Sequence, residues 1–298
     1  MGTKSTIEWT GATWNPVTGC AAVSEGCRHC YAARLTHGRL RHNPRYAGLT
    51  NTAGHFNGVV KCHEDLLDVP LHWRKPRMIF VNSMSDLFHV GVPFDFIVGV
   101  YATMIMARQH TYQILTKRPE RAAEILSMMA TTDNLDEELS RRWEDRKIKR
   151  SDRRLYDIYT AGLWPPPNVW LGTSCEDQAT FDARVPHLTH CPTAVRFVSL
   201  EPLLGPIVLR FTHLLNWVIV SGESGPGARP MQPDWVRSIR DQCVAAGVPF
   251  FWKQFGKLSN NPDPKDHTAK ENGGHAKGGR LLDGRTWDEM PEVNHVGR

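Results

Sequence analysis

Short apolar runs recur along this chain and are separated by stretches long enough to form helices. Each run is nearly continuous in apolar residues, which is typical of parallel strands that are covered on both faces. A further strand is expected just before Cys20, within residues 13–19. The alternation of strands with helix-length stretches predicts repeated βα units. The six clearest runs lie at residues 78–84, 112–117, 169–174, 196–202, 217–223 and 250–255.

Helical apolar spacing appears between these runs, at residues 93–109, 119–130 and 233–247. The last of these stretches begins with Pro233 and closes at Gly247, which are residues that commonly start and stop helices. Strands that alternate with helices predict an α/β fold. The sheet is expected to be either a barrel or an open doubly wound sheet.

Polar side chains follow several of the predicted strands. In parallel α/β folds the carboxyl ends of the strands line the ligand site, so these side chains are expected to meet at one edge of the sheet. Each of them could instead cap a neighbouring element. The strand-ending residues are Ser83, Asp86, Lys117, Ser174, Glu201 and Glu223.

Two segments interrupt the alternation of strands and helices. We therefore predict a barrel domain at residues 1–256 and an extension at residues 257–298. Residues 131–167 form a charged insertion, in which residues 141–154 hold eight Arg or Lys against three acidic residues. This insertion is either a solvated helical face or a contact for nucleic-acid phosphates. The extension is rich in Gly, Asn, Pro and Asp, and is expected to be loop-rich.

Composition places the chain among globular proteins, with 41% hydrophobic residues and a mean hydropathy of -0.40. The net charge of +5 suits a nucleic-acid substrate but does not require one. No apolar run approaches the roughly 18 residues of a membrane span, and the first residues lack the apolar core of a signal peptide. We therefore expect a cytoplasmic protein with no membrane partner.

Cys20, Cys27 and Cys30 lie close together, with spacings of six and two intervening residues. Thiolates are the natural ligands of iron–sulfur clusters, and three of them leave one iron of a four-iron cluster open to a small molecule. Zinc is the main alternative, because His29 or His63 could complete a tetrahedral site. The other four cysteines supply no second Cys-x-x-Cys pair.

The cysteine loop, NPVTGCAAVSEGCRHCYAAR at residues 15–34, resembles the cluster loop of radical S-adenosylmethionine proteins related to spore photoproduct lyase. Its first spacer has six residues rather than the usual three. Over residues 6–256 the chain also resembles the phage Gp37/Gp68-like family, a group known as a domain of unknown function. The strings that support this second resemblance include TWNPVTGC, GCRHCYA, IFVNSMSDLF, LTKRPER, RFVSLEPLLGPI and WVIVSGESGPGARP.

The first resemblance implies a partial (βα)6–7 barrel of the TIM-like, radical S-adenosylmethionine type. It implies a [4Fe–4S] cluster on the three cysteines and a bound S-adenosylmethionine that yields a 5′-deoxyadenosyl radical. Lys117 is expected to pair with the methionyl carboxylate, with a substrate phosphate or with Glu201. The positions that would contact S-adenosylmethionine are Ser83, Ser85, Asp86, Lys117, Ser174, Glu201 and, in the glycine-rich loop after its strand, Glu223.

The same resemblance implies a nucleic-acid substrate, DNA in preference to RNA, and a lyase reaction that reverses thymine photodamage. Cys175 is the candidate hydrogen-atom donor, and Tyr31 is the aromatic residue best placed to meet substrate. An external electron donor such as flavodoxin or ferredoxin is expected. Two alternatives remain: radical modification of RNA, a peptide or a metabolite, and a non-catalytic zinc-binding module for nucleic acid or protein.

Overall fold

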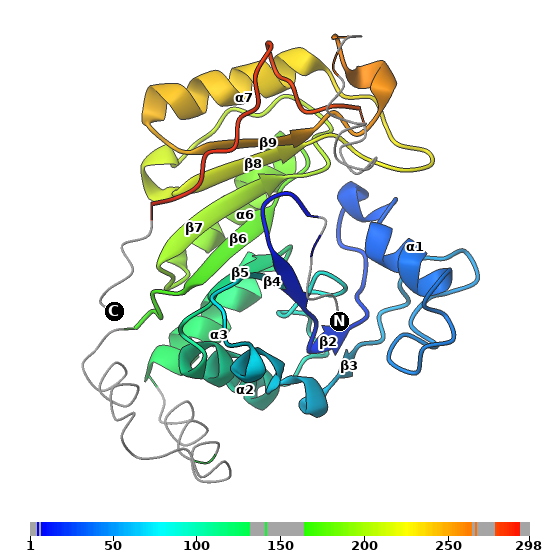
Figure 1. Cartoon of the computed structure of the whole chain (residues 1–298), viewed down its shortest axis with the longest axis vertical. Helices are drawn as coiled ribbons and strands as arrows, with labels where there is room; N and C mark the ends of the chain where they lie inside the picture. Colours follow the sequence, from blue (N-terminus) through cyan, green and yellow to red (C-terminus); the bar gives the residue numbers. More distant parts are fainter. Residues whose placement is uncertain are drawn as a thin grey trace.

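A seven-stranded parallel sheet curls into a half-barrel in the computed structural model, which describes residues 5, 7–131, 141, 164–263, 266 and 278–292 (Figure 1). The strands follow one another across the sheet in chain order, and every neighbouring pair is parallel. All carboxyl ends therefore lie along one edge. The strands are β1 (Ala12–Trp14), β4 (Met78–Val81), β5 (Thr111–Thr116), β6 (Val169–Ser174), β7 (Val195–Leu200), β8 (Trp217–Ser221) and β9 (Phe250–Gln254).

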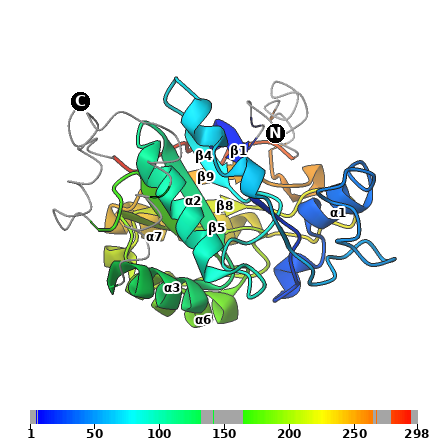
Figure 2. The same ribbon diagram turned by 90° about the horizontal axis from the view of Figure 1, so that it is seen from below.

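The helices that connect the strands cover the convex face of the half-barrel (Figures 1 and 2). Val, Ile and Leu side chains from alternate strand positions pack there against the apolar faces of the helices and form the larger core. These helices are α2 (Phe94–Met106), α3 (Pro119–Thr131), α6 (Gln178–His190) and α7 (Pro233–Ala246). The short helix α1 (Tyr31–His37) lies apart from them, beside the carboxyl edge of the sheet.

Aromatic side chains fill the concave face toward the amino ends of the strands, where Trp9 of the N-terminal segment packs against Phe197 and Trp217, and Trp170 packs against Trp217. Gly172 makes room for this cluster, because a Cβ at that position would lie 2.5 Å from the Phe197 ring. The aromatic cluster closes one end of the half-barrel. The polar groups of the candidate site lie beyond this cluster, toward the carboxyl end of the sheet.

A two-stranded antiparallel ribbon of β2 (Val17–Thr18) and β3 (Lys61–Cys62) joins the two ends of a long excursion at residues 19–60. The three clustered cysteines and α1 belong to this excursion. His63 Nε2 and Thr18 Oγ1 lie 2.9 Å apart and add a side-chain contact at the ribbon. The ribbon therefore anchors the cysteine loop at the edge of the sheet.

The strand pattern read from the sequence is confirmed, since all six apolar runs and the segment before Cys20 contain strands of one parallel sheet. Its curled shape and one-sided helix cover are compatible with a partial TIM-like barrel. Helix α6 was not expected, because Pro186 interrupts its pattern. Its start nevertheless has a sequence signal, since Asp177 and Thr180 cap it reciprocally.

The predicted charged insertion falls largely at residues 132–140 and 142–163, outside the described residues. The described part of the C-terminal extension is loop-rich and docks on the sheet: Trp252 N donates to Trp287 O (2.9 Å), and Trp217 Nε1 donates to Glu289 O (2.8 Å). Among the helices described, none combines the length and apolar character of a membrane span.

Candidate functional site

The chain leaving β1 and the chain leaving β4 are tied together at the carboxyl edge. Ser83 Oγ donates to Asn15 Oδ1 (3.1 Å), and Ser85 Oγ donates to Val17 O (2.9 Å). Both serine hydroxyls are therefore engaged within the protein. Their effect is to fix the path of the backbone that enters the cysteine loop at Cys20.

Cys20, Cys27 and Cys30 are free thiols at this edge, and none is fully buried. Ser24 Oγ lies 3.9 Å from Cys27 Sγ. Burial raises the pKa of Cys20 to about 12 and also raises the pKa of Cys30. The Cys20 and Cys30 sulfur atoms are therefore protonated at neutral pH.

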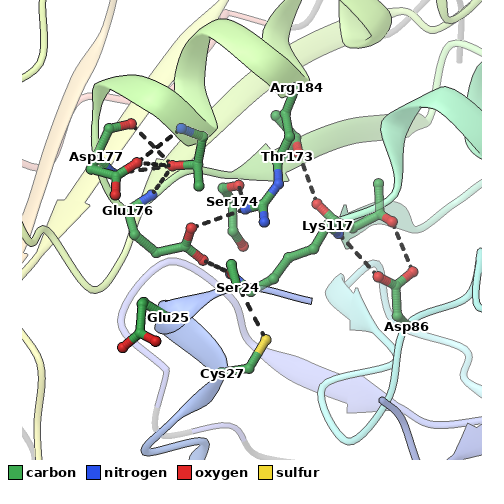
Figure 3. A network of polar contacts seen from close by, with 12 residues as sticks. Ser24, Glu25, Cys27, Asp86, Lys117, Thr173, Ser174, Glu176, Asp177 and Arg184 are labelled. Carbon is green, nitrogen blue, oxygen red and sulfur yellow. Dashed lines mark hydrogen bonds and ion pairs between the residues drawn. The ribbon is translucent and has the colours of Figure 1, made fainter. Parts of the chain in front are cut away.

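Glu176, two residues after β6, is the charged centre beneath the cysteine loop, with a side chain only 1% exposed. Lys117 Nζ (2.6 Å) and Ser24 Oγ (2.9 Å) donate to its Oε1, and Arg184 donates to its Oε2 (3.0 Å; Figure 3). Burial acts to raise the pKa of Glu176, but the two cations outweigh burial and lower it. The carboxylate therefore joins the cysteine loop to β5 and α6.

Gly26 is the point at which the cysteine loop passes closest to this carboxylate. A Cβ at Gly26 would lie 2.2 Å from Glu176 Oε1, well inside van der Waals contact. Only glycine permits so close an approach. The loop is therefore fitted to Glu176 by shape as well as by hydrogen bonds.

Asp86 is buried, and both of its carboxylate oxygens accept two hydrogen bonds from the protein. Oδ1 accepts from Thr116 Oγ1 (2.8 Å) and the Phe88 amide (3.0 Å). Oδ2 accepts from the Lys117 amide (3.0 Å) and Arg118 (2.9 Å). This carboxylate fastens the loop after β4 to the end of β5, and its contact with a methionyl ammonium stays a prediction.

Arg118 links Asp86 to the first cysteine. Its Nη1 lies 3.9 Å from Cys20 Sγ, and its Nη2 donates to Ala21 O (3.1 Å). The guanidinium is mostly buried, with its side chain 12% exposed. A fixed positive charge therefore stands beside Cys20.

The glycine-rich loop at residues 222–230 packs over the other side of the cysteine loop. Arg229 donates to Glu223 from Nη2 (2.6 Å) and Nε (2.9 Å), and His29 Nδ1 lies 3.0 Å from the same carboxylate. Burial acts to raise the pKa of Glu223, but Arg229 and His29 outweigh burial and lower it to about 2. Arg34 donates to two carbonyls of the loop, so helix α1 is held there too.

Polar side chains occupy the carboxyl half of the concave face. Ser174 pairs with Ser199 across β6 and β7, and Glu201 follows Ser199 on the same face by the alternation of a strand. The Ser199 hydroxyl is buried and has no hydrogen-bond partner among the described residues. An orphaned hydroxyl at this position is suited to a bound ligand.

Lys253 is the partner of Glu201, since its Nζ donates to Glu201 Oε1 (2.7 Å) and lies 4.0 Å from Glu8 Oε2. The expected pairing of Glu201 with Lys117 is wrong, because Lys117 reaches Glu176 instead. Burial acts to lower the pKa of Lys253, but Glu201 and Glu8 outweigh burial and raise it. Lys253 is therefore a protonated cation on the concave face.

Tyr31 and Cys175, the two expected catalytic residues, occupy different environments. Tyr31 follows Cys30, is 46% exposed, and donates its hydroxyl hydrogen to Ser83 O. Cys175 is fully buried in the core between sheet and helices, and burial raises its pKa to about 12. The structure gives Tyr31 an open position beside the cysteine loop and gives Cys175 none.

Most of the expected positions do meet at one edge, but the residues that hold them together were missed. Glu176 stands two residues after a strand-ending serine, so the strand-end signal could have found it. Ser24, Arg118, Arg184 and Arg229 gave no comparable signal, because their partners are distant in sequence. Their roles follow only from the fold.

Cys20, Cys27 and Cys30 are the candidate metal ligands at this edge. Among the described residues, no group of three His, Cys, Asp or Glu side chains is placed to hold one metal ion. A four-iron cluster held by three cysteines binds each thiolate through a different iron. The three free thiols on one loop are the donor type that such a cluster takes, and cluster binding stays a prediction.

Comparison with known proteins identifies one matching family. The model of a family described as "Protein of unknown function (DUF5131)" matches residues 4–291 of this chain. No curated protein and no solved structure matches the chain.

Proposed function

We propose that this chain, which belongs to the DUF5131 family, is a radical S-adenosylmethionine enzyme that acts on nucleic acid. One observation carries the proposal: a single short loop brings three free thiols, Cys20, Cys27 and Cys30, to the carboxyl edge of a parallel half-barrel. Ligand sites of parallel α/β folds lie at that edge.

Cys20, Cys27 and Cys30 would hold a [4Fe–4S] cluster. When bound together with S-adenosylmethionine, the cluster supplies the one-electron chemistry that starts hydrogen-atom abstraction. Glu176 and Arg118 hold this loop in place through their hydrogen bonds to Ser24 and to Ala21 O. A loop held in this way has less conformational freedom to lose when iron binds, which lowers the entropic cost of assembly.

The polar row on the concave face is the proposed site for S-adenosylmethionine. The hydroxyls of Ser174 and Ser199 suit the ribose, and Lys253 and Glu201 offer opposite charges to the methionyl carboxylate and ammonium. The aromatic cluster below this row closes the site on that side and excludes water. Tyr31, partly exposed beside Cys30, is the aromatic side chain proposed to meet substrate.

DNA is the proposed substrate, and a lyase reaction on thymine photodamage is the first reaction to examine. The net charge of +5 and the likeness of the cysteine loop to photoproduct lyases support this choice. Flavodoxin or ferredoxin is the proposed electron donor. Radical modification of RNA is the second candidate, since the same charge favours either nucleic acid.

The test begins with anaerobic purification, reconstitution with iron and sulfide, reduction, and addition of S-adenosylmethionine. Mass spectrometry then measures 5′-deoxyadenosine. Cys27→Ala is the test variant, and Cys62→Ala is the matched control, because Cys62 is also a partly exposed free cysteine but lies in β3 outside the loop.

We expect product from the wild type and from Cys62→Ala and none from Cys27→Ala. Product that survives in Cys27→Ala would remove the cysteine loop from the reaction. A wild-type chain that retains zinc and forms no product would replace the proposal with the metal-binding module.

A further inference from the structure

The excursion that follows the cysteine loop has a one-sided charge. Residues 28–63 contain five Arg and one Lys and no Asp or Glu. The whole chain has 36 Lys and Arg against 31 Asp and Glu, so the part outside this segment is close to neutral. Residues 28–63 therefore carry a large share of the basic excess of the chain, as residues 141–154 also do, and residues 28–63 lie beside the site.

Two of these cations are paired with carboxylates just outside the segment. Arg45 binds Asp65 through two hydrogen bonds (3.1 and 2.6 Å), and Arg28 lies 3.8 Å from Glu25. Both pairs are largely exposed, so their charges are only partly offset.

The other four cations form no ion pair within the described part of the chain. Arg34 and Lys61 donate to backbone carbonyls and so keep their full charge. Arg39 and Arg41 are exposed in the turns after α1, and Arg41 Nε donates to the ring of His42 (2.8 Å). Unpaired, exposed arginines are the groups that bind phosphates in a bidentate manner.

The position of this segment places its charge beside the chemistry. Helix α1 begins at the residue after Cys30, and the turns with Arg39 and Arg41 continue from its end (Figure 1). Tyr31, on the first turn of α1, is 46% exposed. An exposed aromatic ring next to a basic surface can stack with a nucleobase while the cations hold the backbone.

An acidic protein that forms a stable complex is a weaker match to this surface. Stable protein interfaces need a buried apolar centre with aromatic anchors. Within residues 28–63 only Tyr31 and Val59 are large apolar side chains with substantial exposure. The surface is otherwise composed of turns rich in Arg, His, Asn and Gly, which offer hydrogen-bond donors rather than apolar area.

We propose that residues 28–63 form the surface that binds the nucleic-acid backbone and delivers a strand to the cysteine loop, with Arg39 and Arg41 on the phosphates. The inference rests on the proposed function for its substrate class. Backbone binding itself requires no cluster, and it can be measured on the full chain before reconstitution.

The experiment is fluorescence anisotropy with labelled single- and double-stranded oligodeoxynucleotides between about 50 and about 200 mM salt. The test variant is Arg39→Gln/Arg41→Gln. The matched control is Arg74→Gln/Lys75→Gln, which removes the same charge from exposed residues before β4, at the opposite edge of the sheet. Thermal unfolding of both variants checks that the fold is unchanged.

We expect the slope of log affinity against log salt to fall by about 1.8 on duplex in the test variant, from about 0.9 for each lost phosphate contact. The control should retain the wild-type slope. Equal losses in both variants would reduce the effect to overall charge and overturn the proposal. An unchanged slope together with slower reduction by flavodoxin would assign the surface to the electron donor instead.

The two proposals can fail separately. Oligonucleotide binding that depends on Arg39 and Arg41 in a chain that forms no cluster would retain this surface and remove the radical chemistry. A chain that forms 5′-deoxyadenosine but binds no oligonucleotide would retain the chemistry and remove the surface.

Discussion

Replacing Glu176 with glutamine removes the carboxylate to which Lys117, Arg184 and Ser24 all donate. The Glu176 side chain is 1% exposed, and those of Lys117 and Arg184 are 20% and 10% exposed. Removing one partner of a buried pair costs about 3–5 kcal/mol, since the remaining charges lose their compensation. We expect about 3 kcal/mol, because both cations retain some access to water.

The matched control is Asp283→Asn. Asp283 also stands between two arginines, Arg237 and Arg240, but it is 40% exposed and lies away from the cysteine loop. Asn tolerates its left-handed backbone conformation (φ 54°). Exposed pairs contribute about 0–1 kcal/mol, so the control should change stability little.

Urea unfolding followed by tryptophan fluorescence measures both variants, and iron and sulfide per chain are counted after reconstitution. Glu176→Gln should lose stability and hold less iron than the control, because the carboxylate anchors the loop through Ser24. Ser24→Ala should cost only about 1 kcal/mol, as expected for one hydrogen bond. Stability and iron content equal to those of Asp283→Asn would refute the role given to Glu176.

The other predictions concern neighbouring positions. Gly172→Ala should destabilise the chain by about 1–3 kcal/mol through overpacking against Phe197, with iron content per folded chain unchanged; a loss of iron would contradict the separation of core and site. Arg229→Gln should leave Glu223 without its main cation and speed proteolysis at residues 222–230; unaltered cleavage would show that the pair does not order this loop. Because the pKa of Glu176 is lower in the folded chain than its unfolded-state value near 4.5, the ionised carboxylate stabilises the fold above that value. The difference in unfolding free energy between the wild type and Glu176→Gln should therefore narrow as pH falls through the folded-state pKa. A difference that does not change with pH would assign the effect to packing.

The sheet could be predicted because its strands are apolar on both faces and end in polar residues. Runs such as 169–174 and 250–255 cannot bury so much apolar surface except between layers, so their pattern specifies the strand directly. Helix α6 gave a weaker pattern because Pro186 interrupts it, although the capping pair of Asp177 and Thr180 marks its start.

The sequence predicted where the polar side chains of the site lie, but it did not predict which of them form ion pairs with one another. The polar residues after the strands do meet at one edge, because parallel strands end together. The ion pairs that form depend on the distances between side chains across the curled sheet. Lys117 pairs with Glu176, and Glu201 pairs with Lys253, which lies two strands away. Such partners leave no spacing in the sequence, so the assignment of Lys117 to Glu201 failed.

The most direct test of the central claim is electron paramagnetic resonance of the reconstituted, reduced chain before and after addition of S-adenosylmethionine. The account predicts a [4Fe–4S] signal that depends on Cys20, Cys27 and Cys30 and changes when S-adenosylmethionine binds the open iron. A signal that is absent in the wild type, or one that S-adenosylmethionine leaves unchanged, would contradict it.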